Sequence, residues 1–124
     1  MVFCFDLDET IYSFPKFFSE FINGLQKLGY KVGIMTANKE RDKEANLKLL
    51  DKLSISPDFY IGKPDGFKGS NGIFKGKACK ELNVDVLFDD FEASDDKMIA
   101  DFFTVNDNTI PFTSWGYKNV VDTK

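Results

Sequence analysis

The sequence predicts an α/β protein in which helices cover a central parallel sheet. Strand-like apolar segments alternate with segments of helical periodicity along most of the 124 residues. This alternation is typical of parallel strands joined by crossover helices. The first apolar segment, Val2–Phe5, contains no charged residue, as expected of a central strand that is buried on both faces. The length favours one domain, residues 1–124, around one core.

The elements after the first strand are predicted from apolar spacing and from helix-breaking residues. Ser13 is expected to cap the first helix, which Gly29 ends, and Asn38 is expected to cap the second. Residues 106–124 give no clear pattern. In chain order the predictions are a helix up to residue 28, a strand at 30–35, a helix at 39–53, a strand at 59–61, a loop at 62–72, a helix at 74–82, a strand at 84–88, a helix at 94–102 and a strand at 103–105.

An acidic cluster directly follows the first strand. Asp6, Asp8 and Glu9 place three carboxylates within four residues, and their mutual repulsion at the end of a buried strand favours a bound cation such as Mg²⁺. Asp6 and Asp8 face the same side of an extended chain. Because ligands bind beyond the carboxyl ends of parallel strands, the pattern favours a phosphoryl-transfer site with one Asp as nucleophile and the other as proton shuttle. The alternative is an acidic helix cap, to which Thr10 would contribute.

Polar residues of suitable types also follow two later predicted strands. Thr36 follows the second strand, and Asp89 and Asp90 follow the fourth. Lys75 and Lys77 lie at the predicted start of the helix before that fourth strand. Because parallel strands bring their carboxyl ends to one edge of the sheet, we expect these residues to meet. Each alone also has a plain structural explanation, as a threonine bonded to its own backbone, a turn or a surface lysine.

The composition excludes several other kinds of chemistry. The chain has no histidine, which rules out a Ser-His-Asp triad, a Cys-His dyad and histidine-ligated zinc. It also lacks the glycine fingerprints of dinucleotide sites and P-loops. The net charge of −4 gives no general attraction to nucleic acid or to an anionic membrane. A local group of lysines could still meet an anionic substrate, namely Lys63, Lys68, Lys75, Lys77 and Lys80.

The two cysteines, Cys4 and Cys79, lie in apolar segments. We expect them to be small buried residues in a reducing compartment and not a disulfide. No signal peptide and no apolar run of membrane-spanning length is found in the sequence. A cytoplasmic protein without a membrane partner is therefore expected.

Taken in order, these motifs resemble those of the haloacid dehalogenase-like (HAD) hydrolases, a superfamily dominated by Mg²⁺-dependent phosphatases. The segment from Asp6 to Thr10 is similar to the first family motif, and the strand ending in Thr36 to the second. The lysine before the last acidic strand is similar to the third motif, and Asp89-Asp90 to the fourth. The resemblance covers residues 1–105. It implies a three-layer Rossmann-like core and phosphomonoester hydrolysis through an aspartyl-phosphate.

The resemblance also implies a role for each motif residue. Asp6 would attack phosphorus, and Asp8 would protonate the leaving oxygen and then activate water. The catalytic lysine would be Lys75, with Lys77 as the alternative, while Lys80 would face solvent. The implied metal ligands are Asp6, Asp8 (through its backbone carbonyl), Asp89 and Asp90, and the implied phosphate-binding residues are Thr36, Asn38, Lys75 and Lys77.

Two departures from the family pattern affect the substrate. Glu9 stands where many members have glycine, although some phosphoserine-polypeptide phosphatases share this motif. The intervals between motifs are too short for a large insertion, so the chain resembles a member with a minimal cap or none. Such an open site would suit a nucleotide, a nucleic-acid end or a phosphoprotein, or would be covered by oligomerisation. The loop at 62–72 and the aromatic residues within 112–117 are candidates for a partial lid.

Two other functions are compatible with these residue types. A signalling receiver domain holds a phosphoryl group with a similar set of Asp, Thr, Lys and Mg²⁺. Its phosphorylated Asp follows the third strand, whereas the third predicted strand here ends at Gly62 without an acid. A phosphatase-like domain that serves only for binding is the other alternative, and the presence of every expected catalytic residue type speaks against it. The sequence predicts neither the substrate identity nor the oligomeric state.

Overall fold

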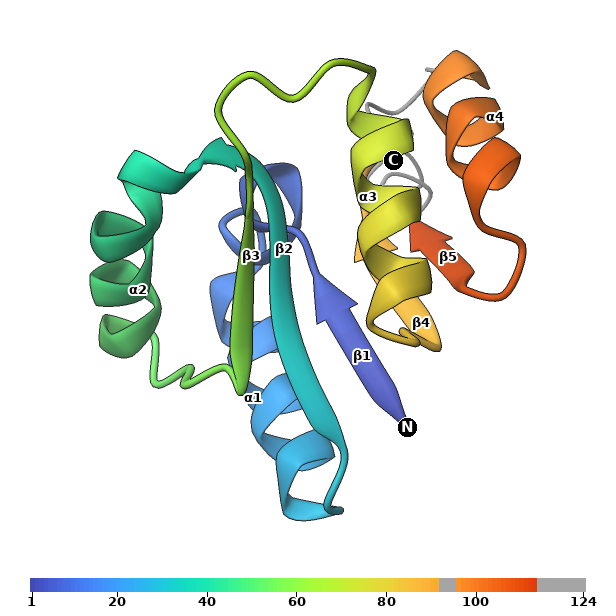
Figure 1. Ribbon diagram of the computed structural model, residues 1–124. Coiled ribbons are helices and arrows are strands. Elements are labelled where there is room, and N and C mark those ends of the chain that lie inside the picture. The colour runs from blue at the N-terminus through green and yellow to red at the C-terminus, as the bar shows by residue number, and fades with distance from the viewer. Residues whose placement is uncertain (92–95, 114–124) are drawn as a thin grey trace, which may run out of the picture.

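Five parallel strands form the centre of the molecule, in the spatial order β3-β2-β1-β4-β5 (Figure 1). The structure is a computed structural model that describes residues 1–91 and 96–113. The strands are β1 (Val2–Phe5), β2 (Lys31–Lys39), β3 (Phe59–Lys63), β4 (Val86–Asp89) and β5 (Ile110–Thr113). The helices are α1 (Pro15–Lys27), α2 (Lys43–Lys52), α3 (Asn71–Glu81) and α4 (Asp96–Val105), with short turns at Leu7–Ile11 and Glu40–Asp42.

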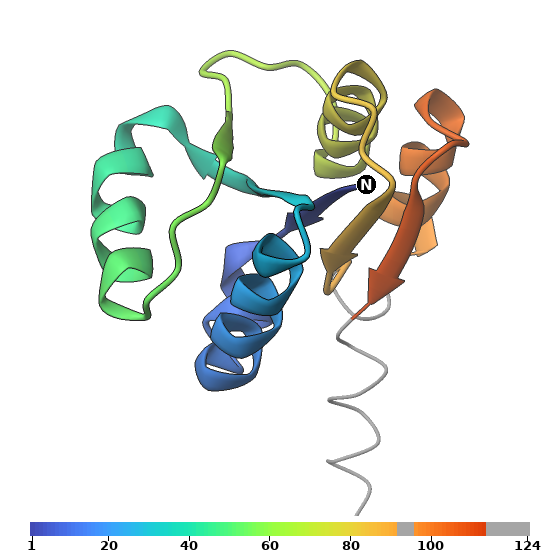
Figure 2. The same ribbon diagram turned by 90° about the horizontal axis from the view of Figure 1, so that it is seen from below.

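Helices cover both faces of the sheet, as the sequence predicts. Figure 2 shows α1 on one side of the strands and α3 and α4 on the other. Successive side chains of a strand point to opposite faces, so Phe3 and Phe5 of β1 enter the core under α1. Cys4 enters the core under α3 and α4. The central strand is therefore buried on both faces, which explains its unbroken apolar sequence.

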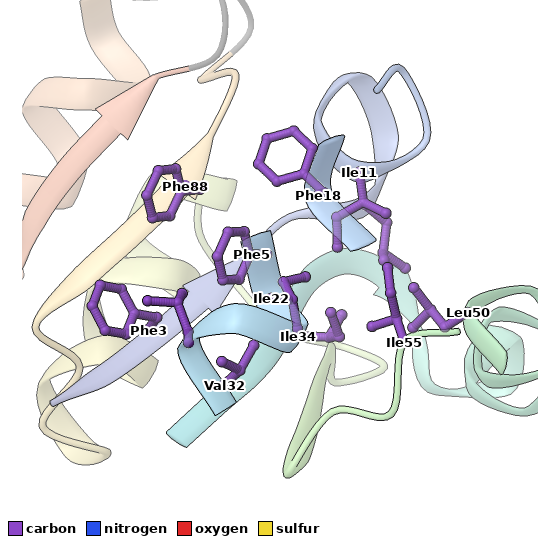
Figure 3. Close-up of a cluster of buried hydrophobic side chains, with 12 residues drawn as sticks. Phe3, Phe5, Ile11, Phe18, Ile22, Val32, Ile34, Leu50, Ile55 and Phe88 are labelled. Carbon is purple, nitrogen blue, oxygen red and sulfur yellow. The ribbon is translucent and has the colours of Figure 1, made fainter. Parts of the chain in front are cut away.

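Aromatic rings fill the core on the α1 face, where Figure 3 shows Phe5 and Phe88 side by side. Their rings are stacked with centroids 4.7 Å apart and planes 4° from parallel. The rings of Phe18 and Phe21 meet Phe5 edge-on at 5.7 and 5.9 Å. Such ring pairs stabilise a fold by about 0.5–1.5 kcal/mol each beyond the burial of their area. This cluster therefore joins β1, β4 and α1 directly beneath the carboxyl ends of the two strands.

The second strand extends four residues beyond its predicted end. Thr36 pairs with Gly62, and after a bulge Lys39 pairs with Lys63. Asn38 consequently lies inside β2 and does not cap a helix, because α2 begins only at Lys43. The prediction of a strand at 30–35 followed directly by a helix is wrong here, since pairing with β3 outweighs the polar character of these residues.

The starts of two helices, α1 and α3, also differ from the predictions. Helix α1 is preceded by Phe14 without a side-chain cap, so the predicted Ser13 cap is wrong, whereas Gly29 ends the segment with φ +89° as expected. Helix α3 begins earlier than predicted, at Asn71, because the Ser70 hydroxyl accepts a hydrogen bond from the Ile73 N–H at 3.2 Å. The loop between β3 and α3 therefore covers only residues 64–70.

The prediction of a strand at 103–105 is wrong, because these residues belong to α4. The last strand, β5, lies at Ile110–Thr113, within the stretch for which the sequence gives no clear pattern. The reason for the helical conformation is packing. The side chain of Phe102 points from α4 into the core and is fully buried. The side chain of the next residue, Phe103, is exposed, as expected when successive residues of a helix face different directions. The predicted start of this helix, at residue 94, lies outside the described residues.

Two glycines allow α3 and α4 to approach closely. A Cβ atom at Gly76 would lie 2.6 Å from Cγ2 of Val105 and 2.8 Å from the carbonyl oxygen of Phe102. A Cβ atom at Gly72 would meet the carbonyl oxygen of Met98. The contact between these helices therefore depends on small residues.

We expect Gly76→Ala to lower the free energy of unfolding by about 1–3 kcal/mol, because the added methyl group overpacks the contact with α4. The matched control is Gly24→Ala in α1, where nothing lies within 4 Å of the added atom. Alanine should raise stability there by about 0.5–1 kcal/mol through its higher helix propensity. Urea unfolding of both variants measures the difference, and equal stabilisation of the two would contradict the packing argument.

The two cysteines are free and fully buried, which confirms the predicted burial and the prediction that they form no disulfide. The Cys79 Sγ atom lies 3.6 Å from Sδ of Met35 in the core on the α3 face. Burial raises the pKa of Cys79 to about 12, so its thiol stays protonated at neutral pH. Among the described residues, no helix has both the length and the apolar character needed to cross a membrane.

Candidate active site

Asp6 and Asp89 lie side by side at the carboxyl edge of the sheet. Phe5 pairs with Phe88 in the ladder between β1 and β4, and the Asp6 N–H donates a hydrogen bond to the Phe88 carbonyl oxygen at 2.9 Å. Each acid is therefore the residue that follows a paired phenylalanine. β1 and β4 also flank the place where the strand order changes direction, and in open α/β sheets this place is where ligands bind.

Asp90 joins these two residues in a compact carboxylate cluster. One carboxylate oxygen from each of Asp6, Asp89 and Asp90 lies within 4.8 Å of the others. Asp6 is 6% exposed and Asp89 is fully buried, while Asp90 is half-buried. The Phe91 N–H donates to Oδ1 of Asp89 at 2.9 Å, which fixes the orientation of that carboxylate. The sequence-predicted acids at the ends of the first and fourth strands thus meet.

Lys75 is the cation that faces this cluster. Its side chain is 2% exposed, and its Nζ atom lies 3.2 Å from Oδ1 of Asp6 and donates a hydrogen bond to Oδ2 of Asp89. Burial alone would lower the pKa of Lys75, but the carboxylates of Asp89 and Asp6 outweigh it and raise that pKa. The ammonium group is therefore held in its charged form between two acids.

Lys75 is the fifth residue of α3 and does not open the helix as predicted, because the helix begins at Asn71. Lys77, the alternative catalytic lysine, is exposed two residues further along α3 and does not line the site. Lys80 is also exposed, as predicted. A spacing of two residues turns a helical side chain to the opposite side, so α3 presents only one of these lysines to the acids.

The carboxylates are crowded for a site with a single ammonium group. Burial raises the pKa of Asp6 to about 8, although Lys75 lowers it, and the charges of Asp89 and Asp90 raise it further. When all three carboxylates are ionised, as they would be around a bound cation, they leave a formal charge of −2 against the one ammonium group. A divalent cation would balance this charge, and an all-oxygen ligand set suits a hard ion such as Mg²⁺. Asp6, Asp89 and Asp90 could hold a metal ion.

Asp8 and Glu9 are the two exposed residues of the turn at Leu7–Ile11, which directly follows Asp6. Both line a small cavity of about 80 Å³ together with Asp6. The side chain of Asp8 is not one of the three grouped carboxylates, so metal binding through its backbone carbonyl stays a prediction. Glu9 has φ +62°, a conformation that favours glycine. The turn after Asp8 is therefore sharp, and a glycine would adopt it with less strain than Glu9 does.

Thr36 reaches the same cavity from β2 and is buried. Its Oγ1 atom accepts a hydrogen bond from the Asn38 N–H at 3.1 Å, so the local backbone bond considered as a plain explanation for this residue is present. A hydroxyl can donate while it accepts, so Thr36 can still bind an anion. The Asn38 side chain is half-buried and does not line the cavity.

Sequence reasoning missed Asn71, Ala37 and Met98, which complete the lining of the cavity. Asn71 is the first residue of α3, and its Oδ1 atom accepts a hydrogen bond from Lys63 Nζ at 2.8 Å. The Ser70 cap could have revealed this helix start, because serine is a favoured capping residue. Nothing in the sequence pattern indicates that α4 brings Met98 to the site.

The two segments predicted as a partial lid, the loop at 62–72 and the aromatic residues within 112–117, lie in different places relative to the cavity. The loop at 64–70 borders a second hollow beside the cavity, lined by Pro64, Asp65, Gly66 and Phe67. Phe112 lies on the outermost strand, is exposed, and contacts the ring of Phe88 at 5.0 Å. The remaining aromatic candidates, at 114–117, lie outside the described residues. Among the described residues no further domain covers the cavity.

Comparison with known proteins supports the fold. No protein-family model and no curated protein sequence matches the chain. A solved structure of a Pnkp1/Rnl/Hen1 complex contains a chain with 18% identity and a TM-score of 0.67, and the match covers 90% of this chain and 44% of the other. A second, of the Pnkp1/Rnl/Hen1 RNA repair complex, gives 16% identity, a TM-score of 0.62, and coverage of 91% and 42%. This chain spans less than half of those chains, and likeness at this identity shows the α/β fold alone.

Proposed function

We propose that the protein is a Mg²⁺-dependent phosphatase of the HAD type, which hydrolyses phosphomonoesters through an aspartyl-phosphate on Asp6. The observation that carries this proposal is the cluster of Asp6, Asp89 and Asp90 with the buried ammonium group of Lys75 against two of them. A merely structural ion pair would not need a third acid beside it, whereas a site for a cation and a phosphate does.

The residues would act in two displacement steps. A carboxylate oxygen of Asp6 attacks phosphorus, and the bond from phosphorus to the leaving oxygen breaks while Asp8 donates a proton to that oxygen. Asp8 then takes a proton from water, whose oxygen attacks phosphorus and releases Asp6 and inorganic phosphate. Lys75 and the Thr36 hydroxyl stabilise the negative charge on the transferring group.

The placement of the residues supports these roles. Asp6 is held by Lys75 on α3 and by the ladder between β1 and β4, so its position is well defined. Asp8 is exposed, as suits a group that exchanges protons with solvent and with a leaving group. When bound by Asp6, Asp89 and Asp90, Mg²⁺ would neutralise the charge between the nucleophile and the phosphate.

The open cavity is compatible with a phosphate carried by a large molecule. Nucleotides, nucleic-acid ends and phosphoproteins are all candidate substrates for such a site. The proteins similar in fold are chains of complexes that include an RNA repair complex, which adds weight to nucleic-acid phosphates within this proposal.

We expect turnover of p-nitrophenyl phosphate to fall to background when divalent ions are chelated, and to return when Mg²⁺ is added in excess. Neutralisation of the carboxylate cluster should also stabilise the fold. At a Mg²⁺ concentration a hundred times its Kd the free energy of unfolding should rise by about 2.7 kcal/mol. Activity is followed by nitrophenol release, and stability by urea unfolding with and without the ion.

Three results would point elsewhere. Undiminished turnover in the presence of a chelator would contradict the metal site. A protein that is inert toward every phosphoester but becomes stably labelled by acetyl phosphate would be a phospho-acceptor of the receiver type. A protein inert in both assays would be a phosphatase-like binding domain.

A further inference from the structure

A second, larger hollow of about 610 Å³ adjoins the candidate active site. The two cavities share Ala37 and Asn71 in their linings, so the hollow continues outward from the carboxylates over the ends of β2 and β3. Asn71 also bonds to Lys63 in this hollow. The full lining consists of Ala37, Lys39, Arg41, Lys63, Pro64, Asp65, Gly66, Phe67 and Asn71; we call it the cationic hollow.

Positive charge gathers in the cationic hollow although the chain as a whole is acidic. Lys39, Arg41 and Lys63 line it, against the single acid Asp65, while the whole chain has a net charge of −4. None of these three cations forms a salt bridge within the described residues. These cations are therefore not held in direct ion pairs with the described acids, and they lie beside the acidic cavity that contains Asp6.

The backbone brings two of these cations together. The bulge between Thr36 and Lys39 resets the register of β2 on β3, so that Lys39 becomes the partner of Lys63. Like charges on neighbouring strands destabilise a sheet. The Nζ atom of Lys63 is held by Asn71 and lies 5.8 Å from the ring centroid of Phe67. An anion bound between the two lysines would offset the repulsion between their charges.

We propose that the cationic hollow binds the backbone phosphates of a single nucleic-acid strand whose terminal phosphate occupies the carboxylate site. This inference rests on the proposed phosphatase function and names its substrate class. The hollow is far larger than one phosphate group, and three cations match a chain of repeating negative charges. The Phe67 ring in the lining adds a surface of the type on which bases stack. A phosphopeptide carries no such regular charge, so it is the weaker candidate.

The first experiment compares two substrates with the same enzyme. Its readout is the ratio of kcat/KM for a terminally phosphorylated hexanucleotide, tested with the phosphate at either end, to kcat/KM for p-nitrophenyl phosphate. We expect Lys39→Gln/Arg41→Gln to lower this ratio roughly tenfold, because two phosphate contacts are lost. Both side chains are exposed, so the fold should be retained.

The matched control is Lys27→Gln/Lys31→Gln. Lys31 lies at the opposite end of the same strand as Lys39, and Lys27 lies in the last turn of α1. This variant removes the same number of exposed charges from the amino edge of the sheet, and its ratio should equal that of the unaltered protein. An equal fall in both double variants would mean a general charge effect and would overturn the proposal.

A binding measurement separates this inference from the proposed function. Fluorescence anisotropy with a labelled hexanucleotide gives Kd over a range of salt concentrations, without any need for turnover. The Lys39→Gln/Arg41→Gln protein, called the hollow variant, should bind the hexanucleotide roughly tenfold more weakly than the unaltered protein. Its slope of log K against log salt should be shallower by about 1.4, or about 0.7 for each of the two lost contacts with a single strand. The control variant should keep both values.

The outcomes of the two experiments are distinct. Turnover of p-nitrophenyl phosphate with unchanged strand binding in the hollow variant would overturn this inference and leave the phosphatase proposal standing. Strand binding that depends on the hollow, in a protein without any phosphatase activity, would overturn the phosphatase proposal instead. A phosphoserine peptide that is preferred over the hexanucleotide, and loses the same tenfold in the hollow variant, would also overturn the nucleic-acid assignment.

Discussion

Asp6→Asn is expected to abolish the turnover of p-nitrophenyl phosphate, with a loss of at least about a thousandfold in kcat. An amide oxygen is a poor nucleophile and cannot form the aspartyl-phosphate. The substitution keeps the shape of the side chain next to Lys75 and the ladder bond to Phe88. The loss should therefore come from chemistry and not from misfolding, and initial rates at saturating substrate and Mg²⁺ measure it.

Stability provides the control for this experiment. Burial raises the pKa of Asp6 to about 8, so without Mg²⁺ the fold should tolerate the uncharged amide, and the melting temperature should stay within a few degrees. Stabilisation by Mg²⁺ should shrink, because one of the three carboxylates is lost. Asp51→Asn, an exposed acid on α2, should keep full activity. Substantial turnover by Asp6→Asn would show that Asp6 is not the nucleophile.

Lys75→Met is expected to lower both stability and activity. Its ammonium group is the partner of two buried carboxylates, Asp6 and Asp89. Removal of one partner from a buried ion pair costs about 3–5 kcal/mol, because a charge is left without compensation. Added Mg²⁺ should recover part of the stability by neutralising the acids, but activity should stay low, since the charge on the transferring phosphoryl group would lose its stabilising lysine.

Lys77→Met is the matched control, because this lysine lies two residues further along α3 and is exposed. Its free energy of unfolding should change by no more than about 0.5 kcal/mol. Urea unfolding and initial rates of both variants decide which lysine serves the site. A larger loss of activity in Lys77→Met than in Lys75→Met would reverse the assignment made from the structure.

The parallel sheet and the meeting of the acids could be predicted because they depend on local pattern. Val2–Phe5 is apolar throughout, which indicates a strand covered on both faces, and parallel strands necessarily bring their carboxyl ends to one edge. Asp6 and Asp89 therefore had to be neighbours once β1 and β4 were adjacent. The choice of Lys75 over Lys77 agrees with the geometry, although Lys75 lies in the second turn of α3 and not at the predicted start of the helix.

What could not be predicted depends on contacts between distant residues. Thr36–Lys39 are polar or small, and only their pairing with Gly62 and Lys63 makes them a strand. Residues 103–105 have the composition of a strand, but they continue α4 because that helix packs closely on Gly72 and Gly76 of α3. The cationic hollow has no sequence signature, since Lys39 and Lys63 become neighbours only through a bulge.

The stacked rings of Phe5 and Phe88 have a consequence for how the site binds its ligands. They join β1 to β4 one residue before Asp6 and Asp89, so the spacing of these carboxylates is set before any ligand arrives. Their repulsion is therefore overcome during folding, by aromatic packing, and not at the moment of binding. An ion that binds there would meet a preorganised pair of oxygens and would lose little affinity to ordering the chain. The protein thus exchanges some stability of its ligand-free form for a site that is ready to bind.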